Sequence, residues 1–250
     1  MNFTQGEFIY INKPYGMTSF GALAYVRTRI SRKMGVKRVK TGHAGTLDPL
    51  ATGVLILCTG KKTKDIERLQ LHTKEYTATL QLGATTPSYD MEHEVNATYP
   101  TAHITRELID EKLRLFIGDI MQVPPSYSAV KVNGDRAYEL KRKGRDVELK
   151  AKPVHIDEIE VTDFDADKML LSIRVVCGKG TYIRSLARDI GRALDSGAYL
   201  TALCRTQLGN VRIEDCVTLD EFPQWLDRQE ITNEVSEQKS KIENISSIVK

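Results

Sequence analysis

The alternation of apolar and polar residues over 75–82 constrains the fold of this chain more than any other feature. Tyr76, Ala78, Leu80 and Leu82 fall on one face and polar side chains fall on the other, which predicts a half-buried β-strand. Further strands are predicted over 7–11, 54–58, 154–164 and 169–177, the last two as a hairpin. Because the strands come in runs without regular βαβ alternation, we expect an α+β fold with a mixed, largely antiparallel sheet.

Three helices are predicted from apolar spacing. The first begins at Thr18 or Ser19 and runs to about residue 34, and the second covers 105–117 and is stopped by Gly118. The third, over 181–194, has its apolar residues within an arc of about 100°. Its arginines at 184, 188 and 192 drift from the edge of that face to the opposite side. Arg184 is therefore expected at the border of the core, within reach of a partly buried anion.

The composition is that of a globular enzyme, with 41% hydrophobic and 28% charged residues in 250. The longest strongly apolar run, 54–58, is far too short to span a membrane, and the N-terminus does not resemble a signal peptide. The cysteines are widely spaced without a C-x-x-C pair, so we expect reduced thiols in a cytoplasmic protein. After Trp225 the apolar pattern dissolves. We therefore expect one domain over 1–226 and a polar tail over 227–250.

Positive charge is concentrated in two segments. Residues 27–40 hold seven Lys/Arg and no acid, and residues 131–152 hold eight basic and four acidic residues, whereas 153–173 hold six acids and one Lys. Such basic segments are typical of proteins with a polyanionic partner, although a solvated surface has the same pattern.

Common cofactor and metal motifs are missing from the sequence. There is no P-loop, no G-x-G-x-x-G before a helix, no G-x-S-x-G, and no zinc-type spacing of His and Cys. We therefore expect neither a cofactor nor a metal ion. The densest segment is 42–53, where three glycines and His43 lie directly before a predicted buried strand. Asp48-Pro49 within it is a typical helix start, but glycines also let a backbone approach a ligand closely.

The segment GHAGTLDPLATGVL at 42–55 resembles the catalytic motif of the TruB family of tRNA pseudouridine synthases. The similarity continues through further blocks in the order of the family, covering about residues 7–222: KPYGMTS (13–19), KEYTATLQLG (74–83), QVPPSYSAVKVNGDRAYELKRKG (122–144), CGKGTYIRSLARDIG (177–191) and ALCRTQLG (202–209). The resemblance implies a pseudouridine-synthase core with a central cleft. It also implies isomerisation of uridine 55 in the T arm of tRNA.

The resemblance assigns roles to six residues. Asp48 matches the catalytic aspartate, an ionised carboxylate that acts as nucleophile. His43 matches the histidine that helps to open the RNA loop, and Tyr76 matches the tyrosine that packs on the target base. Tyr182, Arg184 and Leu203 match further pocket residues, the arginine pairing with the aspartate. Attack at uracil carbon 6 and attack at the ribose anomeric carbon both remain open. Taken singly, Tyr76 and Leu203 would more often be core residues, and His43 a hydrogen-bonded loop histidine.

The chain departs from the family in two places. Relatives usually have a glycine soon after the Asp of a T-x-x-x-D stretch, whereas YDMEHE at 89–94 has none, so this turn has to form without one. Many relatives also carry a C-terminal RNA-binding PUA domain, for which about 25 polar residues after Trp225 do not suffice. We expect a monomer with no obligatory protein partner. The alternatives are a guide-RNA-dependent enzyme of the dyskerin class and a non-catalytic RNA-binding or tRNA-folding protein.

Overall fold

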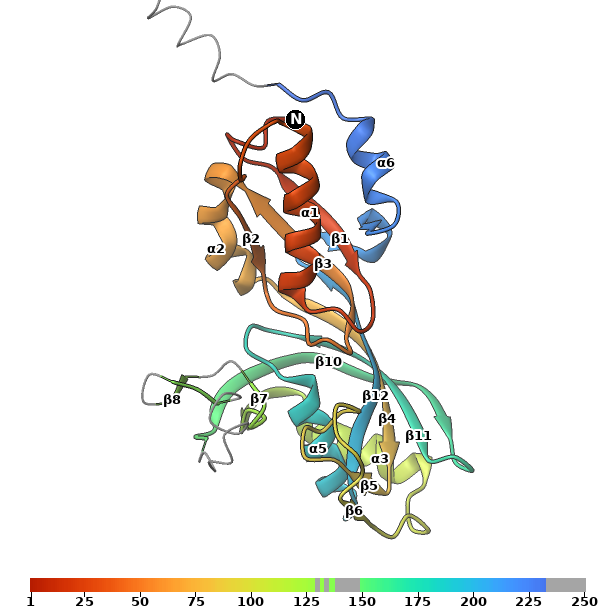
Figure 1. Ribbon diagram of the computed structural model, residues 1–250. Helices are drawn as coiled ribbons and strands as arrows, with labels where there is room; N and C mark the ends of the chain where they lie inside the picture. The colour runs from red at the N-terminus through yellow and green to blue at the C-terminus, as the bar shows by residue number, and fades with distance from the viewer. Residues whose placement is uncertain (129–130, 133–134, 138–148, 233–250) are drawn as a thin grey trace, which may run out of the picture. The chain divides into compact units, whose positions relative to one another are not determined.

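The computed structural model describes residues 1–128, 131–132, 135–137 and 149–232 (Figure 1). The chain divides into two compact units. Unit 1 comprises Met1–Pro49, Gly53–Gln70 and Val211–Lys250, and unit 2 comprises Leu50–Thr52 and Leu71–Asn210. Unit 1 is therefore assembled from three separate stretches of sequence, whereas unit 2 is nearly continuous.

The sheet of unit 1 is built around β1 (Phe8–Lys13), which pairs antiparallel with β3 (Thr52–Thr59) and parallel with β14 (Val217–Thr218). β2 (Thr41–Ala44) pairs antiparallel with β3. The helices are α1 (Ser19–Lys33), α2 (Ile66–Leu71) and α6 (Phe222–Asp227), with 3₁₀ turns at Gly60–Asp65 and Ile213–Asp215. β13 (Val211–Arg212) begins the C-terminal stretch.

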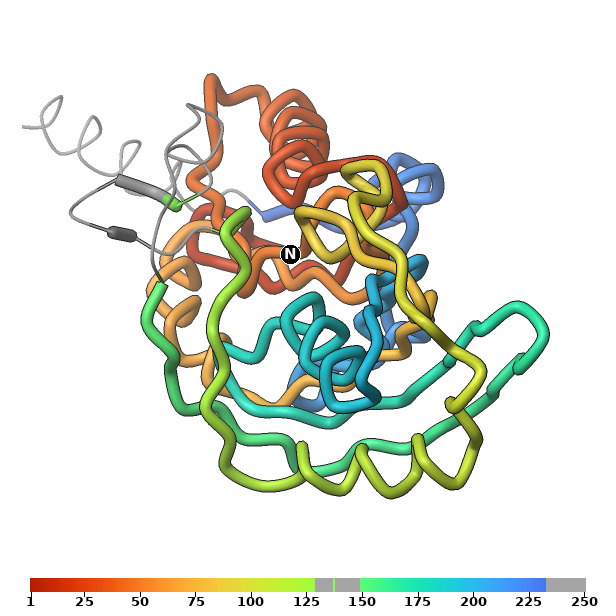
Figure 2. Tube along the Cα trace, turned by 90° about the horizontal axis from the view of Figure 1, so that it is seen from below, coloured from red at the N-terminus to blue at the C-terminus, as the bar shows by residue number. Residues whose placement is uncertain are grey.

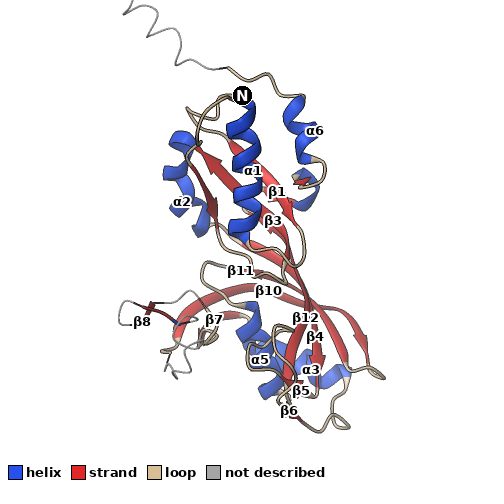
Figure 3. Ribbon diagram, in the orientation of Figure 1, coloured by secondary structure: helices blue, strands red, loops and turns tan. Residues whose placement is uncertain are grey.

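One apolar core joins the three stretches of unit 1. Phe3, Ile9 and Ile30 from the N-terminal stretch cluster with Phe222 and Leu226 from the C-terminal stretch. Thr18 caps α1 by accepting a hydrogen bond from the Gly21 N–H, as the sequence predicts. The short helix α6 follows β14 and lies beside α1 (Figure 3). Phe222 and Leu226 of α6 share the apolar core with residues of α1.

Unit 2 contains an antiparallel sheet in the order β12 (Ala198–Leu208), β4 (Lys74–Leu82), β11 (Leu170–Cys177), β10 (Lys152–Asp165) and β7 (Gly118–Gln122). The predicted alternation of β4 is confirmed, because Tyr76, Ala78, Leu80 and Leu82 are all buried. α5 (Ile183–Ala193) packs against β12 and β4, and α3 (Arg106–Leu113) with the 3₁₀ turn Arg114–Phe116 runs beside β10 (Figure 2). Two small hairpins complete the unit: β5 (Ala84–Thr85) with β6 (Ala97–Thr98), and β8 (Lys131–Val132) with β9 (Asp135–Arg136).

These pairings confirm the predicted α+β fold with a mixed, largely antiparallel sheet. The predicted hairpin is present as β10 and β11, and the predicted helix over 181–194 is α5. The second predicted helix is shorter than expected, since its last turn is 3₁₀ before Gly118, which has φ 91°. No helix in the described ranges is long and apolar enough to cross a membrane.

The first residues of the predicted tail are fastened to unit 1. Asp227 forms an ion pair with Lys33 at 2.7 Å, Ile231 packs against the core, and the Thr232 N–H donates to the Met1 carbonyl at 3.0 Å. The remainder of the predicted tail, 233–250, lies outside the described residues.

Candidate active site

Asp48 lies in a loop of unit 1 between β2 and β3, and the residues on both sides of it are anchored. Ser19 Oγ donates to the Leu47 carbonyl at 2.9 Å and accepts from the Leu47 N–H at 2.8 Å. On the other side, the Pro49 carbonyl accepts from the Gly16 N–H at 2.9 Å and from Lys13 Nζ at 3.2 Å. The loop that carries the half-buried Asp48 is therefore fixed by residues of the KPYGMTS block (13–19).

Lys13 is the central anchor of this loop. Its side chain is completely buried, and its ammonium also donates to the carbonyls of Pro14 at 2.9 Å and Met17 at 2.6 Å. These bonds correct the prediction that Asp48-Pro49 starts a helix. Residues 49–50 form a turn and β3 begins at Thr52, because the Pro49 carbonyl is engaged by Gly16 and Lys13.

The other features of the glycine-rich segment also belong to unit 1. His43 lies on β2 opposite Leu57 of β3 and is half-buried. Gly45 has φ 81° and Gly53 has φ 100°, a region that residues with a side chain rarely adopt. The two glycines therefore permit these backbone conformations just after β2 and at the start of β3, on either side of Asp48.

Tyr76 and Leu203 lie on neighbouring strands of unit 2. Tyr76 of β4 is opposite Val175 of β11 and Arg205 of β12, and Leu203 is opposite Ala78, two residues along β4. Tyr76 is 8% exposed and Leu203 is half-buried. The two predicted pocket residues thus lie on neighbouring strands, offset by two residues.

Tyr182 is the residue before α5, and its backbone is held by Gln122. The Tyr182 N–H donates to Gln122 Oε1 at 2.8 Å, and Gln122 Nε2 donates to the Tyr182 carbonyl at 3.2 Å. Ser185 Oγ and Arg188 Nη2 donate to the Val123 carbonyl at 2.8 and 3.0 Å. The start of α5 is therefore fastened to the segment that follows β7.

Arg184 is buried, with 4% exposure, although it is a charged residue of an amphipathic helix. Its Nε lies 3.7 Å from Asp90 Oδ2, and its Nη1 and Nη2 donate to the carbonyls of Ser88 at 3.3 Å and Tyr127 at 2.9 Å. Buried charges are costly unless they are paired and hydrogen-bonded, so this arrangement stabilises the guanidinium in one orientation. Asp90 is a site residue that the sequence reasoning missed.

The turn at 86–92 forms without a glycine. Tyr89 takes the positive φ of 60° itself. Asp90 Oδ1 accepts from Ser88 Oγ at 2.5 Å and from the Glu92 N–H at 3.0 Å, and the Asp90 carbonyl accepts from Thr86 Oγ1 at 2.6 Å. Side-chain hydrogen bonds thus hold a left-handed residue that glycine would otherwise supply. The sequence signal that could have found Asp90 is an acid that follows two hydroxyl residues, Thr86 and Ser88, at spacings of four and two.

The sequence-predicted residues are therefore divided between the units. Asp48 and His43 belong to unit 1, whereas Tyr76, Tyr182, Arg184 and Leu203 belong to unit 2. Within unit 2, β4 and β12 position Tyr76 and Leu203, and α5 positions Tyr182 and Arg184. The pairing of Arg184 with Asp48 stays a prediction.

Lys74, on the same face of β4 as Tyr76, has the most strongly perturbed amine described in unit 2. Burial lowers its pKa to about 8; the neighbouring Cys177 opposes this, and the charges of Arg205 and Lys179 add to it. Its ammonium donates to the His72 carbonyl at 2.6 Å. In the described ranges no group of three His, Cys, Asp or Glu residues is arranged to hold a metal ion.

The basic segment 27–40 is only partly available to a ligand. Arg29 lies 3.3 Å from the centroid of the Tyr25 ring, and Lys33 pairs with Asp227. Its exposed basic residues are Arg32, Lys33, Lys37, Arg38 and Lys40. The second basic segment, 131–152, lies mostly outside the described residues.

Family models match almost the whole chain. The N-terminal domain model of the TruB family pseudouridylate synthases matches residues 32–183, and the C-terminal domain model of tRNA pseudouridylate synthase B matches 184–244. The second match continues beyond the point where the apolar pattern ends.

Two curated relatives carry the same name, tRNA pseudouridine synthase B. The protein of Bacteroides thetaiotaomicron is 63% identical over 94% of this chain and 98% of its own length. The protein of Flavobacterium johnsoniae is 45% identical over 90% of this chain and 97% of its own length.

Two solved structures resemble the fold at lower identity. A chain of a Cbf5-Nop10-Gar1 complex has a TM-score of 0.65 at 28% identity, over 92% of this chain and 58% of that one. A chain of an H/ACA RNP bound to a substrate RNA has a TM-score of 0.63 at 26% identity, over 90% and 54%. This chain thus spans little more than half the length of those two.

Proposed function

Because the chain belongs to the TruB family of pseudouridine synthases, we propose that it isomerises uridine 55 in the T arm of tRNA, with Asp48 as nucleophile. The chain is an isomerase that converts uridine to pseudouridine in tRNA. The observation that carries the role of Asp48 is the anchoring of its loop through Leu47 and Pro49. A nucleophile must be held in one geometry, and this loop is fixed on both sides of the carboxylate.

The proposed chemistry needs no cofactor. The bond between N1 of uracil and the anomeric carbon of the ribose breaks, the base turns, and carbon 5 bonds to the anomeric carbon. Carbon 5 loses its proton and N1 gains one, so the reaction is redox-neutral. An ionised Asp48 forms a transient covalent bond at either uracil carbon 6 or the anomeric carbon.

The remaining site residues serve the extruded base in this proposal. A target base must leave its stack and be held by aromatic and apolar side chains, which suits Tyr76, Tyr182 and Leu203. Arg184 supplies positive charge for the Asp48 carboxylate, and His43 helps to open the RNA loop. We further propose that the chain acts as a monomer in the cytoplasm and needs no protein partner.

The experiment compares the unmodified chain with Asp48→Asn on an unmodified tRNA transcript. Asn is nearly isosteric with Asp but is not a nucleophile, so the variant should bind tRNA normally and form no pseudouridine. Asp220→Asn, which changes an exposed acid of unit 1, should behave as the parent. Mapping of pseudouridine checks whether position 55 is modified. The role of Asp48 is refuted if Asp48→Asn turns over within about tenfold of the parent, which is a difference of only about 1.4 kcal/mol in the activation barrier.

Guide-RNA-dependent modification is the second candidate, favoured by the likeness to a chain of an H/ACA RNP. The same experiment separates the two candidates, because the purified chain acts alone and no guide RNA is added. Modification of the transcript under these conditions excludes a requirement for a guide. The identities of 63% and 45% to two proteins named tRNA pseudouridine synthase B favour the first candidate, modification of tRNA without a guide.

A further inference from the structure

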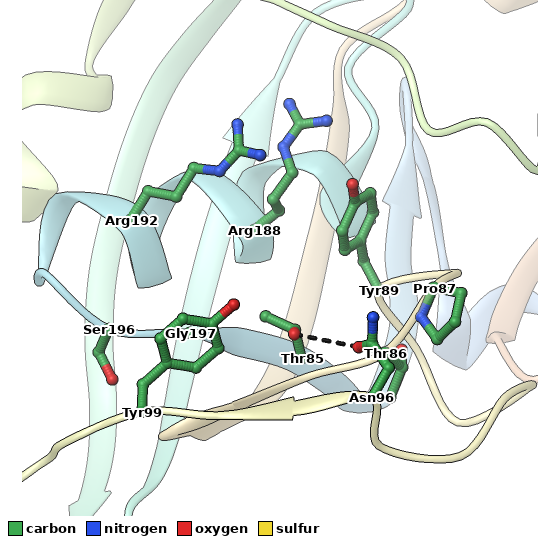
Figure 4. A pocket seen from close by; sticks show the side chains of 10 residues that line it. All are labelled: Thr85, Thr86, Pro87, Tyr89, Asn96, Tyr99, Arg188, Arg192, Ser196 and Gly197. Carbon is green, nitrogen blue, oxygen red and sulfur yellow. Dashed lines mark hydrogen bonds between the residues drawn. The ribbon is translucent and has the colours of Figure 1, made fainter. Parts of the chain in front are cut away.

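A pocket of about 350 Å³ lies in unit 2, between the second half of α5 and the β5–β6 hairpin (Figure 4). It is distinct from the residues assigned to the reaction, and it is lined by Thr85, Thr86, Pro87, Tyr89, Asn96, Tyr99, Arg188, Arg192, Ser196 and Gly197. Its volume is at the lower end of the range for small-ligand sites, roughly 300–1,000 Å³, and suits one nucleotide unit rather than a helix.

The lining carries positive charge without a carboxylate. Arg188 is 6% exposed and is fixed by Asp189, with Nε–Oδ1 at 2.8 Å and Nη2–Oδ2 at 3.0 Å. Its guanidinium also lies 5.2 Å from the centroid of the Tyr89 ring. Arg192 is exposed, and no acid in the described part of the chain pairs with it. The charge of Arg192 is therefore available to an anion.

The opposite wall supplies a hydrogen-bond donor and flat surfaces. Thr85 Oγ1 donates to Asn96 Oδ1 at 3.1 Å, which turns the Asn96 amide nitrogen towards the pocket (Figure 4). The Tyr99 ring lies against Gly197, where a Cβ atom would come within 2.6 Å of it. Two arginines, an amide donor and two tyrosine rings are the groups that bind a phosphate with its attached base or sugar.

The pocket continues the row of arginines that begins in the candidate site. Arg184, Arg188 and Arg192 are four residues apart on α5, which places them about 6 Å apart along the helix axis. Arg184 contacts the 86–92 turn at Ser88 and Asp90, and Arg188 contacts it at Tyr89. The row therefore runs along α5 from the buried Arg184 to the exposed Arg192, and its first two arginines contact the 86–92 turn.

From this arrangement we infer that the pocket binds a phosphate-bearing nucleotide of the RNA substrate other than the target uridine. The inference rests on the proposed function in that the ligand is RNA. A phosphate contact of this kind positions the strand without reading its sequence. The alternative source of the same chemistry is a free mononucleotide.

The test measures tRNA affinity over a salt series for Arg192→Gln and Asn96→Asp. Arg192→Gln removes the available charge at an exposed position, and Asn96→Asp puts a negative charge into the pocket while keeping the oxygen that Thr85 needs. Both should weaken tRNA binding several-fold. For Arg192→Gln, log affinity against log salt should also become flatter, by about 0.7–0.9 for the lost phosphate contact. Arg114→Gln, an exposed arginine of unit 2 outside the pocket, is the matched control and should change neither quantity.

A second titration uses uridine 5′-monophosphate in place of tRNA. If the two variants alter binding of the mononucleotide but leave tRNA affinity and its salt dependence unchanged, the pocket takes a free nucleotide and the proposal is wrong. Unchanged affinity for tRNA in both variants overturns it as well, and leaves Arg192 as a residue that only favours the C-terminal end of α5. Because binding is measured without turnover, failure to form pseudouridine would count against the proposed function alone.

Discussion

At the scale of single residues, the buried Lys13 links the KPYGMTS block (13–19) to the Asp48 loop. Replacing it by Met keeps the length of the side chain but removes the ammonium that donates to three partly buried carbonyls, of which that of Pro49 keeps another donor, the Gly16 N–H. We expect Lys13→Met to lower the free energy of unfolding by about 3 kcal/mol, since each unsatisfied buried acceptor costs about 1–3 kcal/mol and the site relaxes in part.

Turnover should fall more than tRNA affinity in this variant, because the loop that holds Asp48 loses an anchor while exposed basic residues are unchanged. Urea denaturation and single-turnover kinetics measure the two effects. Lys64→Met, at an exposed position of unit 1 outside the basic segment 27–40, is the control. If Lys13→Met unfolds at the same urea concentration as the parent, Lys13 does not anchor the loop.

At the scale of elements, His155 connects β10 to β7, the last strand of the unit 2 sheet. His155 Nδ1 lies 2.7 Å from Asp119 Oδ1 directly across the pair, and this hydrogen bond, together with the charges of Asp119 and Asp157, raises the pKa of His155 above 6.5. A raised pKa in the folded state stabilises the protein below the unfolded value of 6.5, and the contribution is lost as the pH rises through the folded value.

Asp119→Asn should therefore lower stability at pH about 5.5 and have almost no effect at pH about 8.5. Urea midpoints at the two values measure the difference, and Asp163→Asn, at another exposed position of β10, serves as the control. A destabilisation of equal size at both values would mean that the protonated histidine is not involved.

The sequence predicts those elements whose local pattern agrees with their final environment. β4 alternates over its whole length and α5 keeps its apolar arc, so both are predicted correctly. β12 was not predicted as a strand from its own pattern, because register shifts between Leu200 and Ala202 and between Arg205 and Gln207 break its alternation.

The same reasoning separates the predictable part of the site from the rest. The glycines and Asp48 stand out locally, but the helix start at Asp48-Pro49 is overridden by two hydrogen bonds from Lys13 and Gly16, which lie far away in sequence. Asp90 was missed because its partner Arg184 is 94 positions away, and no local rule connects an acid in a turn with a helix in a later segment.

At the scale of the whole molecule, the C-terminal stretch belongs to the core of unit 1. A chain ending at Asn210 lacks Leu219, Phe222 and Leu226, which are at most 6% exposed. Loss of each such side chain costs about 2–5 kcal/mol. The summed loss is comparable with the whole free energy of unfolding of a domain, about 5–15 kcal/mol. We expect the 1–210 chain to lose the fold of unit 1.

A chain ending at Thr232 should by contrast fold and form pseudouridine, since it keeps α6 and the bonds of residues 227–232 to unit 1. Circular dichroism and pseudouridine mapping compare the two truncations with the full chain. A 1–232 protein that is folded but inactive would give the residues after 232 a role in the reaction.

The three-part construction of unit 1 has a consequence for the order in which the protein is made. β1 and α1 leave the ribosome first, but Leu219 and Phe222, which cover their apolar faces, follow roughly 180 residues later, about 10–35 s at bacterial elongation rates. Almost all of unit 2 is synthesised after α1 and before Leu219. Unit 2 can therefore fold while the apolar faces of β1 and α1 are still uncovered. The first segment synthesised is thus among the last to be completed, and a chaperone that shields it during elongation would act on β1 and α1.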